Sequence, residues 1–399
     1  MSLELNKTEQ AVVDGLSSDF SEDLIEVYQS CDHTYIRVEA NNIVDILTYL
    51  KDKHHFIFLC DIVGTDRYTS DERFEVIYNI MNLRTQDRIF VKIRLEEENP
   101  VVKTATSVWK AAGWLEREAY DMFGIRFEGH PDHRRIFMPE DFEYFPLRKE
   151  FPLLGIPGSI ELPNTTPDTE QGMKLKNINS KVDPKFFKEH QRGIYQSLED
   201  KHTTIEEIDS EDPLNAKMVL NMGPQHPATH GVLRLILQLR GELIEKTKID
   251  IGYLHRGVEK IAENKTYQEF MPYTDRMDYL SPYSNNVALC LAVEKLAEVE
   301  VPERAQYIRM ICCELARISS HLLWLGTMVM DAGAISFFIW TFREREKIYD
   351  IFDEVAGHRF TVSHSRIGGV ANDFTDDAVA RIKEFVEKFP QELKDWHGL

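Results

Sequence analysis

Several features that would define a function are scarce or missing in this chain of 399 residues. It has five cysteines, an odd number without a CxxC spacing. This argues against a disulfide framework, a zinc ribbon or an iron–sulfur cluster held by this chain alone, and it predicts reduced thiols in apolar surroundings. Lys and Arg form no block, and 47 basic against 67 acidic residues give a net charge of −20. Because this charge repels phosphate backbones, we expect no nucleic-acid partner.

The sequence also indicates neither a secretory signal peptide nor a membrane-spanning segment. The amino terminus has neither a basic region nor an apolar region of the kind found in secretory signals, so we expect the protein to stay in the cytoplasm. The one long apolar stretch, residues 319–340, contains His321 and Asp331. A charge at midspan is costly in lipid, so we predict a buried helix of a bundle in which Asp331 needs a partner.

Common nucleotide and metal motifs are absent as well. There is no GxGxxG, and GYLHRGVEK continues with Val-Glu where a phosphate-binding loop requires Lys followed by Ser or Thr. His226 and His230 are four residues apart, but Pro227 lies between them and the Glu of a helical HExxH zinc site is missing. NAD binding, ATP binding and zinc hydrolysis are therefore not expected.

The hydrophobic pattern that is present predicts an α+β chain in three parts. Residues 1–154 are expected to form a small α/β sandwich domain, with strands at 33–40, 54–66, 73–81 and 88–97 joined by short connectors. A helix is predicted from Pro100 to a stop at Gly124, followed by an extended segment at residues 130–151, called the arm below. Residues 155–212 are predicted to be an acidic linker, because residues 198–212 contain seven carboxylates and one Lys.

Residues 213–399 are predicted to be a mainly helical domain with a strand-rich entrance. Two or three antiparallel strands are expected within residues 216–257, joined by a loop built around GPQHPATHG. Almost everything after residue 258 has helical periodicity, in segments at 258–270, 284–299, 302–332, 336–357 and 375–389.

Two polar clusters are candidate sites. Prolines stiffen the GPQHPATHG loop, and His230 in it is suited to donate a hydrogen bond or a proton to a buried ligand. The alternative is that both histidines of the loop only hydrogen-bond the backbone of a turn. The second cluster runs from Asp275 to Tyr279 at the entrance of an apolar helix, where its carboxylates have helix capping as the alternative role.

A family resemblance brings these clusters together. The runs NMGPQHPATHGVLRLILQLRGELI, GYLHRGVEK, YTDRMDYLSPYSNN, FREREK and RIGGV resemble, in order and spacing, the D subunit of bacterial NADH:quinone oxidoreductase, respiratory complex I. The earlier run from WLEREAYDMFG to PLRKEFPL resembles the C subunit of the same enzyme. The chain therefore resembles a natural fusion of the C and D subunits.

The D subunit family is related to the large subunit of nickel–iron hydrogenases, which bind their metals through thiolates. At the matching positions of DRMDYLS this chain has Asp278 and Ser281. A carboxylate and a hydroxyl do not replace soft thiolates at such a centre, so hydrogen activation is not expected. Tyr279 takes the place of a glycine, and the resemblance implies that a quinone head group occupies the former metal cavity.

The resemblance also implies roles for individual residues. His230 and Tyr279 match the pair that contacts the two quinone carbonyls, and Asp331 matches the carboxylate that pairs with the histidine. A further segment is expected to face the tetranuclear iron–sulfur (4Fe–4S) cluster held by the B subunit: His255, Arg256 and Gly257. By this interpretation the chain binds no metal or cofactor alone, and ubiquinone or menaquinone is its substrate.

The implied setting is a peripheral subunit on the cytoplasmic face of the cell (inner) membrane. Its partners would be chiefly the B and I subunits and the membrane H subunit, in an assembly that couples NADH oxidation to quinone reduction and proton translocation. For the C-like part the resemblance implies assembly without chemistry. The arm is expected to lie on the helical part and on the B subunit. Charged residues of its helix and arm are expected in helix-surface ion pairs and interface contacts: Glu116, Arg117, Glu118, Asp121, Arg134 and Arg135.

The sequence departs from the family pattern in two ways. Thr361 stands where many members have a histidine beside the terminal cluster, so we expect a low-potential cluster and favour menaquinone. Family D regions also continue well beyond RIGGV, and we interpret the chain as a fragment. Two other functions remain open: the large subunit of a membrane-bound hydrogenase or formate hydrogenlyase, and a scaffold that has lost the quinone site.

Overall fold

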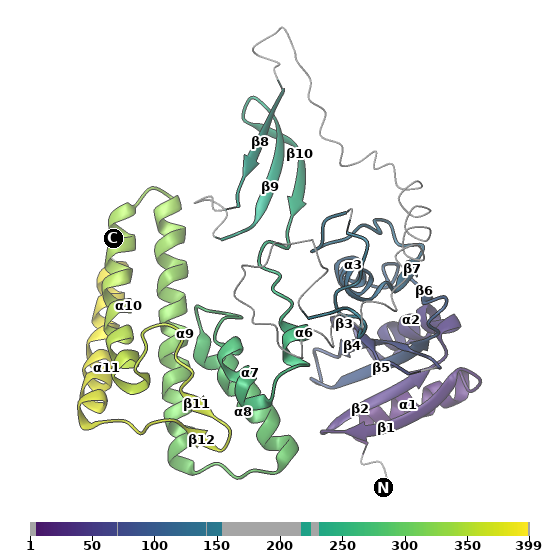
Figure 1. The fold of residues 1–399 in the computed structure, drawn as a ribbon, viewed down its shortest axis with the longest axis horizontal. Helices are drawn as coiled ribbons and strands as arrows, with labels where there is room; N and C mark the ends of the chain where they lie inside the picture. Colours follow the sequence, from purple (N-terminus) through teal and green to yellow (C-terminus); the bar gives the residue numbers. More distant parts are fainter. Residues whose placement is uncertain (1–4, 70, 141, 154–216, 225–230, 398–399) are drawn as a thin grey trace, which may run out of the picture. The chain divides into compact units, whose positions relative to one another are not determined.

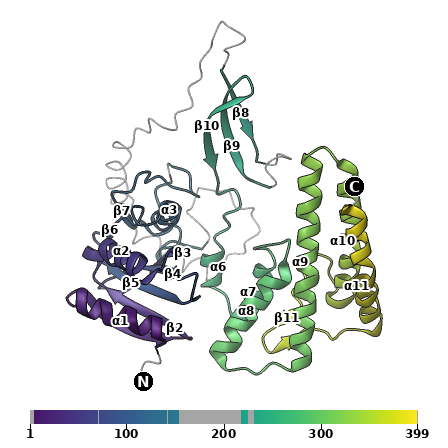
Figure 2. The same cartoon turned by 180° about the vertical axis from the view of Figure 1, so that it is seen from behind.

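A computed structural model describes residues 5–69, 71–140, 142–153, 217–224 and 231–397 of the chain. The chain forms two compact units, residues 1–260 and 261–399, drawn in Figure 1 and from behind in Figure 2. The first unit is rich in strands and the second is mainly helical. The predicted α+β class is therefore confirmed.

A five-stranded sheet forms the centre of the first unit, with strand order β1-β2-β5-β4-β3. The strands are β1 (Leu24–Ser30), β2 (His33–Val38), β3 (Phe58–Asp66), β4 (Phe74–Met81) and β5 (Arg88–Leu95). β2 and β5 pair in parallel, and the other neighbours pair antiparallel. Ile89, Val91 and Ile93 are fully buried at alternate positions, as the period of two in the sequence indicated.

Two helices complete the core of this sheet. They are α1 (Lys7–Asp19) and α2 (Ile43–His54), the latter preceded by a short 3-10 turn (Ala40–Asn42). The prediction of a connector before residue 54 is wrong, because α2 occupies it. Its fully buried side chains, Ile43, Ile46, Leu47 and Leu50, follow the i, i+3, i+4, i+7 spacing of a helix that buries one face.

The helix predicted after Pro100 starts later than expected. The elements here are β6 (Val101–Lys103), α3 (Ala112–Phe123) and β7 (Arg126–Glu128). Residues 101–103 pair in parallel with β7, which suits their β-branched side chains. The predicted stop is confirmed, because Gly124 ends α3 with φ +78°, a conformation that favours glycine.

A three-stranded antiparallel sheet follows in the first unit. Its strands are β8 (Lys217–Met222), β9 (Arg234–Arg240) and β10 (Leu243–Asp250), in the order β10-β9-β8. These are the strands predicted at the entrance to the helical region. Residues 225–230 of the GPQHPATHG loop lie outside the described residues.

The helical part begins at the end of the first unit and fills the second. The helices are α6 (Val258–Ala262), α7 (Tyr267–Thr274), α8 (Pro282–Ala297), α9 (Glu303–Asp331), α10 (Ile335–Ala356) and α11 (Asp376–His397). A short hairpin of β11 (Ser365–Arg366) and β12 (Gly369–Val370) precedes α11. α9 and α10 lie side by side in both views (Figures 1 and 2), and Ile308, Leu315, Ile348 and Phe352 belong to their shared core.

The apolar stretch at residues 319–340 is not one buried helix, because it contains the break between the helical segments predicted at residues 302–332 and 336–357. α9 ends at Asp331 and α10 begins at Ile335. Gly333 between them has φ +103°, which glycine adopts without the steric cost of a side chain. Asp331 is exposed at this break. Within the described part of the chain, no helix combines the length and the apolar character needed to span a membrane.

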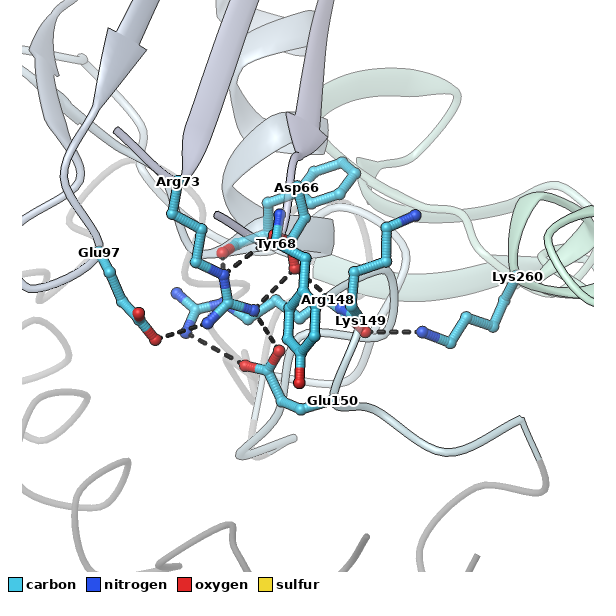
Figure 3. Close-up of polar contacts among 9 residues, drawn as sticks. Asp66, Tyr68, Arg73, Glu97, Arg148, Lys149, Glu150 and Lys260 are labelled. Carbon is cyan, nitrogen blue, oxygen red and sulfur yellow. Dashed lines mark hydrogen bonds and ion pairs between the residues drawn. The ribbon is translucent and has the colours of Figure 1, made fainter. Parts of the chain in front are cut away.

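Figure 3 shows a buried ion pair that anchors the end of the arm to the sheet. Arg73 donates to the two carboxylate oxygens of Asp66 at 2.9 and 2.7 Å, and their side chains are 6% and 0% exposed. The backbone N–H of Lys149 donates to the same carboxylate at 2.8 Å, and Arg73 also pairs with Glu150 and Glu97. Burial raises the pKa of Asp66, but the hydrogen bonds from Arg73 and the backbone outweigh it and lower this pKa overall.

This pair predicts unequal losses of stability for two substitutions, each of which removes one carboxylate partner of Arg73. Asp66→Asn leaves the buried guanidinium without its main counter-ion, and we expect it to lower the free energy of unfolding of the first unit by about 3 kcal/mol. Glu97→Gln removes a partner whose side chain is 53% exposed, and we expect a loss below about 1 kcal/mol. Urea unfolding followed by hydrogen exchange of β3 and β4 measures both. Equal losses would contradict the assignment of the anchor to Asp66.

Candidate functional site

The residues predicted to form a site lie at separate places along the chain. His230 lies outside the described residues, so its role stays a prediction. Tyr279 lies in the loop between α7 and α8, and Asp331 lies at the exposed end of α9. The remaining three form one segment between β10 and α6: His255, Arg256 and Gly257.

The loop that carries Tyr279 is held by hydrogen bonds to its own backbone. The N–H of Ser281 and the side-chain amide of Asn285 both donate to the carbonyl of Asp278, each at 3.1 Å. The ring of Tyr279 lies 6.1 Å from that of Phe360, centroid to centroid, and the residue is 41% exposed. The loop therefore presents a phenol that a ligand can reach.

A buried carboxylate ties this loop to a segment 88 residues further along the chain. Asp275 is fully buried and accepts hydrogen bonds from the backbone N–H of Ser363, at 3.1 Å, and from its hydroxyl. The guanidinium of Arg276 lies 4.0 Å away. Because Ser363 does not belong to α8, capping of that helix does not account for these hydrogen bonds. Asp275 fixes the position of the loop that carries Tyr279.

The segment that Asp275 holds contains a histidine that the sequence reasoning missed. The Oγ1 of Thr361 and the Nδ1 of His358 are 3.5 Å apart. The resemblance implies a histidine at position 361, where this chain has a threonine. The imidazole of His358 nevertheless lies beside that threonine. The only sequence signal was a histidine three residues before Thr361, just after a helix end.

The RIGGV motif is positioned by a second buried ion pair. Glu294 and Arg309 are almost fully buried and pair at 2.6 Å. Arg309 also donates to the carbonyls of Arg366 and Gly369, and the N–H of Gly368 donates to Glu294 at 2.7 Å. Burial raises the pKa of Glu294, but the bonds from Arg309 and Gly368 outweigh it and lower the pKa. The hairpin is therefore fixed to α8 and α9.

The segment predicted to face an iron–sulfur cluster packs on the arm. The rings of His255 and Phe137 are stacked, with centroids 5.2 Å apart and planes 22° apart. Gly252 is so close to the arm that an added Cβ would lie 2.2 Å from the carbonyl oxygen of Phe137. Arg256 is exposed, and Gly257 has φ +60°. The arm thus contacts the segment that follows β10, and its expected packing on the helical bundle stays a prediction.

Charged residues of the C-like part form buried contacts. Asp121 and Arg135 pair at 2.6 Å with both side chains fully buried, so the expectation of a helix-surface ion pair is wrong for them. The carboxylate of Asp121 also accepts the backbone N–H groups of Ile136, Phe137 and Met138 at 3.0, 2.7 and 2.9 Å. A run of N–H groups without secondary-structure partners is thereby satisfied.

A second carboxylate of the same helix is also buried. Glu116 accepts hydrogen bonds from the hydroxyl of Thr104 at 2.5 Å and from the N–H of Ala105 at 2.6 Å. Its carboxylate lies 3.8 Å from the Nε2 of His130. Burial raises the pKa of Glu116 to about 7, although the two hydrogen bonds act in the opposite direction. Burial also lowers the pKa of His130, so the imidazole is neutral at the same pH.

A cavity lies elsewhere in the first unit. A hollow of about 940 Å³ lies between the arm and strands β9 and β10. Its lining includes several cations: Lys110, Arg117, Arg134, Arg234 and Lys248. Tyr279, Asp331 and the segment at residues 255–257 do not line it. Within the described ranges, no group of three or more His, Cys, Asp or Glu side chains is arranged to hold a metal ion.

Family comparisons place these elements in a class. Residues 36–156 match the family described as respiratory-chain NADH dehydrogenase, 30 Kd subunit. Residues 331–399 match the family described as respiratory-chain NADH dehydrogenase, 49 Kd subunit. The chain thus combines two subunits of a respiratory-chain NADH dehydrogenase in one polypeptide.

Individual relatives have the same combination. The chain is 39% identical over 394 residues to one of the C/D subunits of the NADH-quinone oxidoreductase of Aquifex aeolicus. The matched residues make up 98% of this chain and 64% of that protein. It is 42% identical over 367 residues to the C/D subunit from a Hydrogenobaculum species, with shares of 91% and 62%. It is 64% identical over 230 residues to the D subunit from Salinibacter ruber, with shares of 54% and 51%.

The chain belongs to the family of fused C/D subunits of NADH-quinone oxidoreductase, which confirms the resemblance that its motifs indicated. It spans less than two thirds of the length of each of these relatives.

The anchoring of the tyrosine loop is testable. Asp275→Asn weakens the buried acceptor of Ser363, so we expect faster hydrogen exchange at residues 276–281 and at Ser363, by about tenfold for one charged hydrogen bond. Asp278→Asn is the matched control, because Asp278 is exposed and the backbone carbonyl through which it holds Ser281 and Asn285 is retained. Unchanged exchange in Asp275→Asn would show that the contact does not hold the loop.

The raised pKa of Glu116 predicts a pH dependence. The folded state favours the protonated carboxyl, so its contribution is complete below the ordinary pKa and is lost as the pH rises to about 7. We expect the free energy of unfolding of the unmodified chain, relative to Glu116→Gln, to fall by about 3 kcal/mol between about pH 4 and pH 8. Denaturant unfolding of both chains at each pH measures this, and a difference that is constant with pH contradicts it.

Proposed function

We propose that this chain is the peripheral-arm subunit of respiratory complex I that forms the site of quinone reduction. Family membership supports the assignment to the complex. The observation that carries the proposal for the site is Tyr279, a reachable phenol on a loop that buried Asp275 holds in place. The positions that would carry metal-binding thiolates in a hydrogenase are Asp278 and Ser281.

In this proposal Tyr279 and His230 bind the two carbonyl oxygens of the quinone. Reduction adds two electrons and two protons, and negative charge develops on each oxygen. A phenol O–H and an imidazole N–H meet this charge best when they are fixed before the reaction. The tie from Asp275 to Ser363 supplies such fixation for Tyr279. Asp331 has the role of orienting His230 and favouring its protonated state.

Electrons reach the quinone from the 4Fe–4S cluster of the B subunit. We propose that His255, Arg256 and Gly257 face this cluster. Arg256 is exposed in this chain. A cation beside the cluster stabilises the added electron and raises the reduction potential.

The partners in this proposal are the B and I subunits and the membrane H subunit. The chain lies on the cytoplasmic face of the membrane and has no nucleic-acid partner. The electron donor is NADH or another donor, and quinone reduction is coupled to proton movement in the membrane subunits. The substrate is ubiquinone or menaquinone, with menaquinone favoured by the absence of a histidine at Thr361.

Replacement of one hydroxyl tests the quinone site. In the assembled enzyme we expect Tyr279→Phe to lower quinone reductase activity by about 100-fold, the typical effect of losing one donor to developing charge. Tyr307→Phe makes the same chemical change on α9, at a residue that is 57% exposed, and we expect no loss.

Two other results would point to different functions. Full activity in Tyr279→Phe would favour a scaffold that has lost the quinone site. Stoichiometric nickel in the purified complex would favour the large subunit of a membrane-bound hydrogenase or formate hydrogenlyase.

A further inference from the structure

The segment from Gly252 to Lys260 is held by the arm near both of its ends. At the first end, Gly252 lies against the carbonyl of Phe137, and the ring of His255 stacks on that of Phe137. At the second end, the Nζ of Lys260 donates to the carbonyl oxygen of Arg148 at 2.6 Å, as Figure 3 shows. These contacts join sequence regions that are more than 100 residues apart.

The arm itself is rigid at both contact points. Near Phe137, the buried carboxylate of Asp121 accepts consecutive backbone N–H groups. Near Arg148, the guanidinium donates to the carbonyl of Phe123 at 2.6 Å and lies 4.8 Å from the ring of Phe74. The adjacent N–H of Lys149 is bound by the anchor described above. The arm is therefore fixed to the first sheet and to α3 by contacts that do not involve the segment.

Two glycines shape the backbone of this segment. It lies between the end of β10 and the start of α6, and the N–H of His255 donates to the carbonyl of Gly252 at 2.9 Å. Gly252 has φ +106° and Gly257 has φ +60°, so the turn between these two residues begins and ends in conformations that favour glycine. A turn with glycines at both ends has a flexible backbone unless another part of the protein restrains it.

We propose that the arm of the C-like part is a positioning element for this segment, with Phe137 as the residue that orients the imidazole of His255. The arm holds Gly252 and Lys260, and the stacked ring fixes the side chain between them. Arg256 follows His255 directly, so the same restraint fixes the backbone from which its side chain extends. The orientation of this cation relative to the cluster of the B subunit rests on the function proposed above, whereas the restraint of the segment does not.

The test uses the complete fused chain in its assembled complex. Phe137→Leu keeps an apolar side chain but removes the ring that stacks on His255. We expect hydrogen exchange of the His255 amide to become about tenfold faster, in line with the stabilisation that an aromatic pair provides. Phe137→Tyr retains the ring and should restore slow exchange. Phe151→Leu is the matched control, because this ring at the other end of the arm contacts Phe142 and Tyr144 and its loss should leave the exchange unchanged.

A second readout separates the two proposals. If Arg256 faces the cluster, Phe137→Leu also lowers the midpoint potential of that cluster, and Phe137→Tyr restores it. Faster exchange with an unchanged potential supports positioning by the arm and overturns the cluster-facing role of the segment. Unchanged exchange in Phe137→Leu overturns the positioning role. Gly252→Ala provides a second variant, because its Cβ would collide with the arm and is expected to speed exchange in the same segment.

Discussion

Buried carboxylates that accept backbone N–H groups hold the irregular parts of this chain. Asp66 binds the arm at Lys149, Asp121 binds it at residues 136–138, and Asp275 binds Ser363. A carboxylate satisfies several donors at once, and these charge-assisted bonds are stronger than neutral ones. Segments without a helix or a strand thereby acquire fixed positions. Tyr279 lies in one such segment and His255 lies beside another.

This arrangement gives the two parts of the fusion different tasks. The C-like part contributes no group to the proposed chemistry, yet its arm contacts the segment that contains His255. In the helical unit, the ion pair of Glu294 with Arg309 fixes the RIGGV hairpin, and Asp275 holds the loop that carries Tyr279. In the function proposed here, the precision of electron and proton delivery therefore depends on polar groups that do not touch the quinone.

Sequence patterns predicted the regular elements better than the irregular ones. The strands at residues 73–81 and 88–97 and the helix end at Gly124 agree with the structure, because alternation of burial and glycine at a helix end are local signals. The break between the helices predicted at residues 302–332 and 336–357 also agrees with the structure. The helix at residues 43–54 was taken for a connector although its apolar spacing is helical.

The sequence by itself determined the family, the α+β class and the identity of Tyr279 as a candidate, because ordered motifs and residue types are written along the chain. Only the tertiary structure decided which charged groups are buried and which distant segments they join. Asp121 and Asp275 look like ordinary helix carboxylates in the sequence, and their partners are 15 to 88 residues away. A carboxylate becomes an anchor only when the fold removes water and brings N–H donors to it, and no local pattern encodes that event.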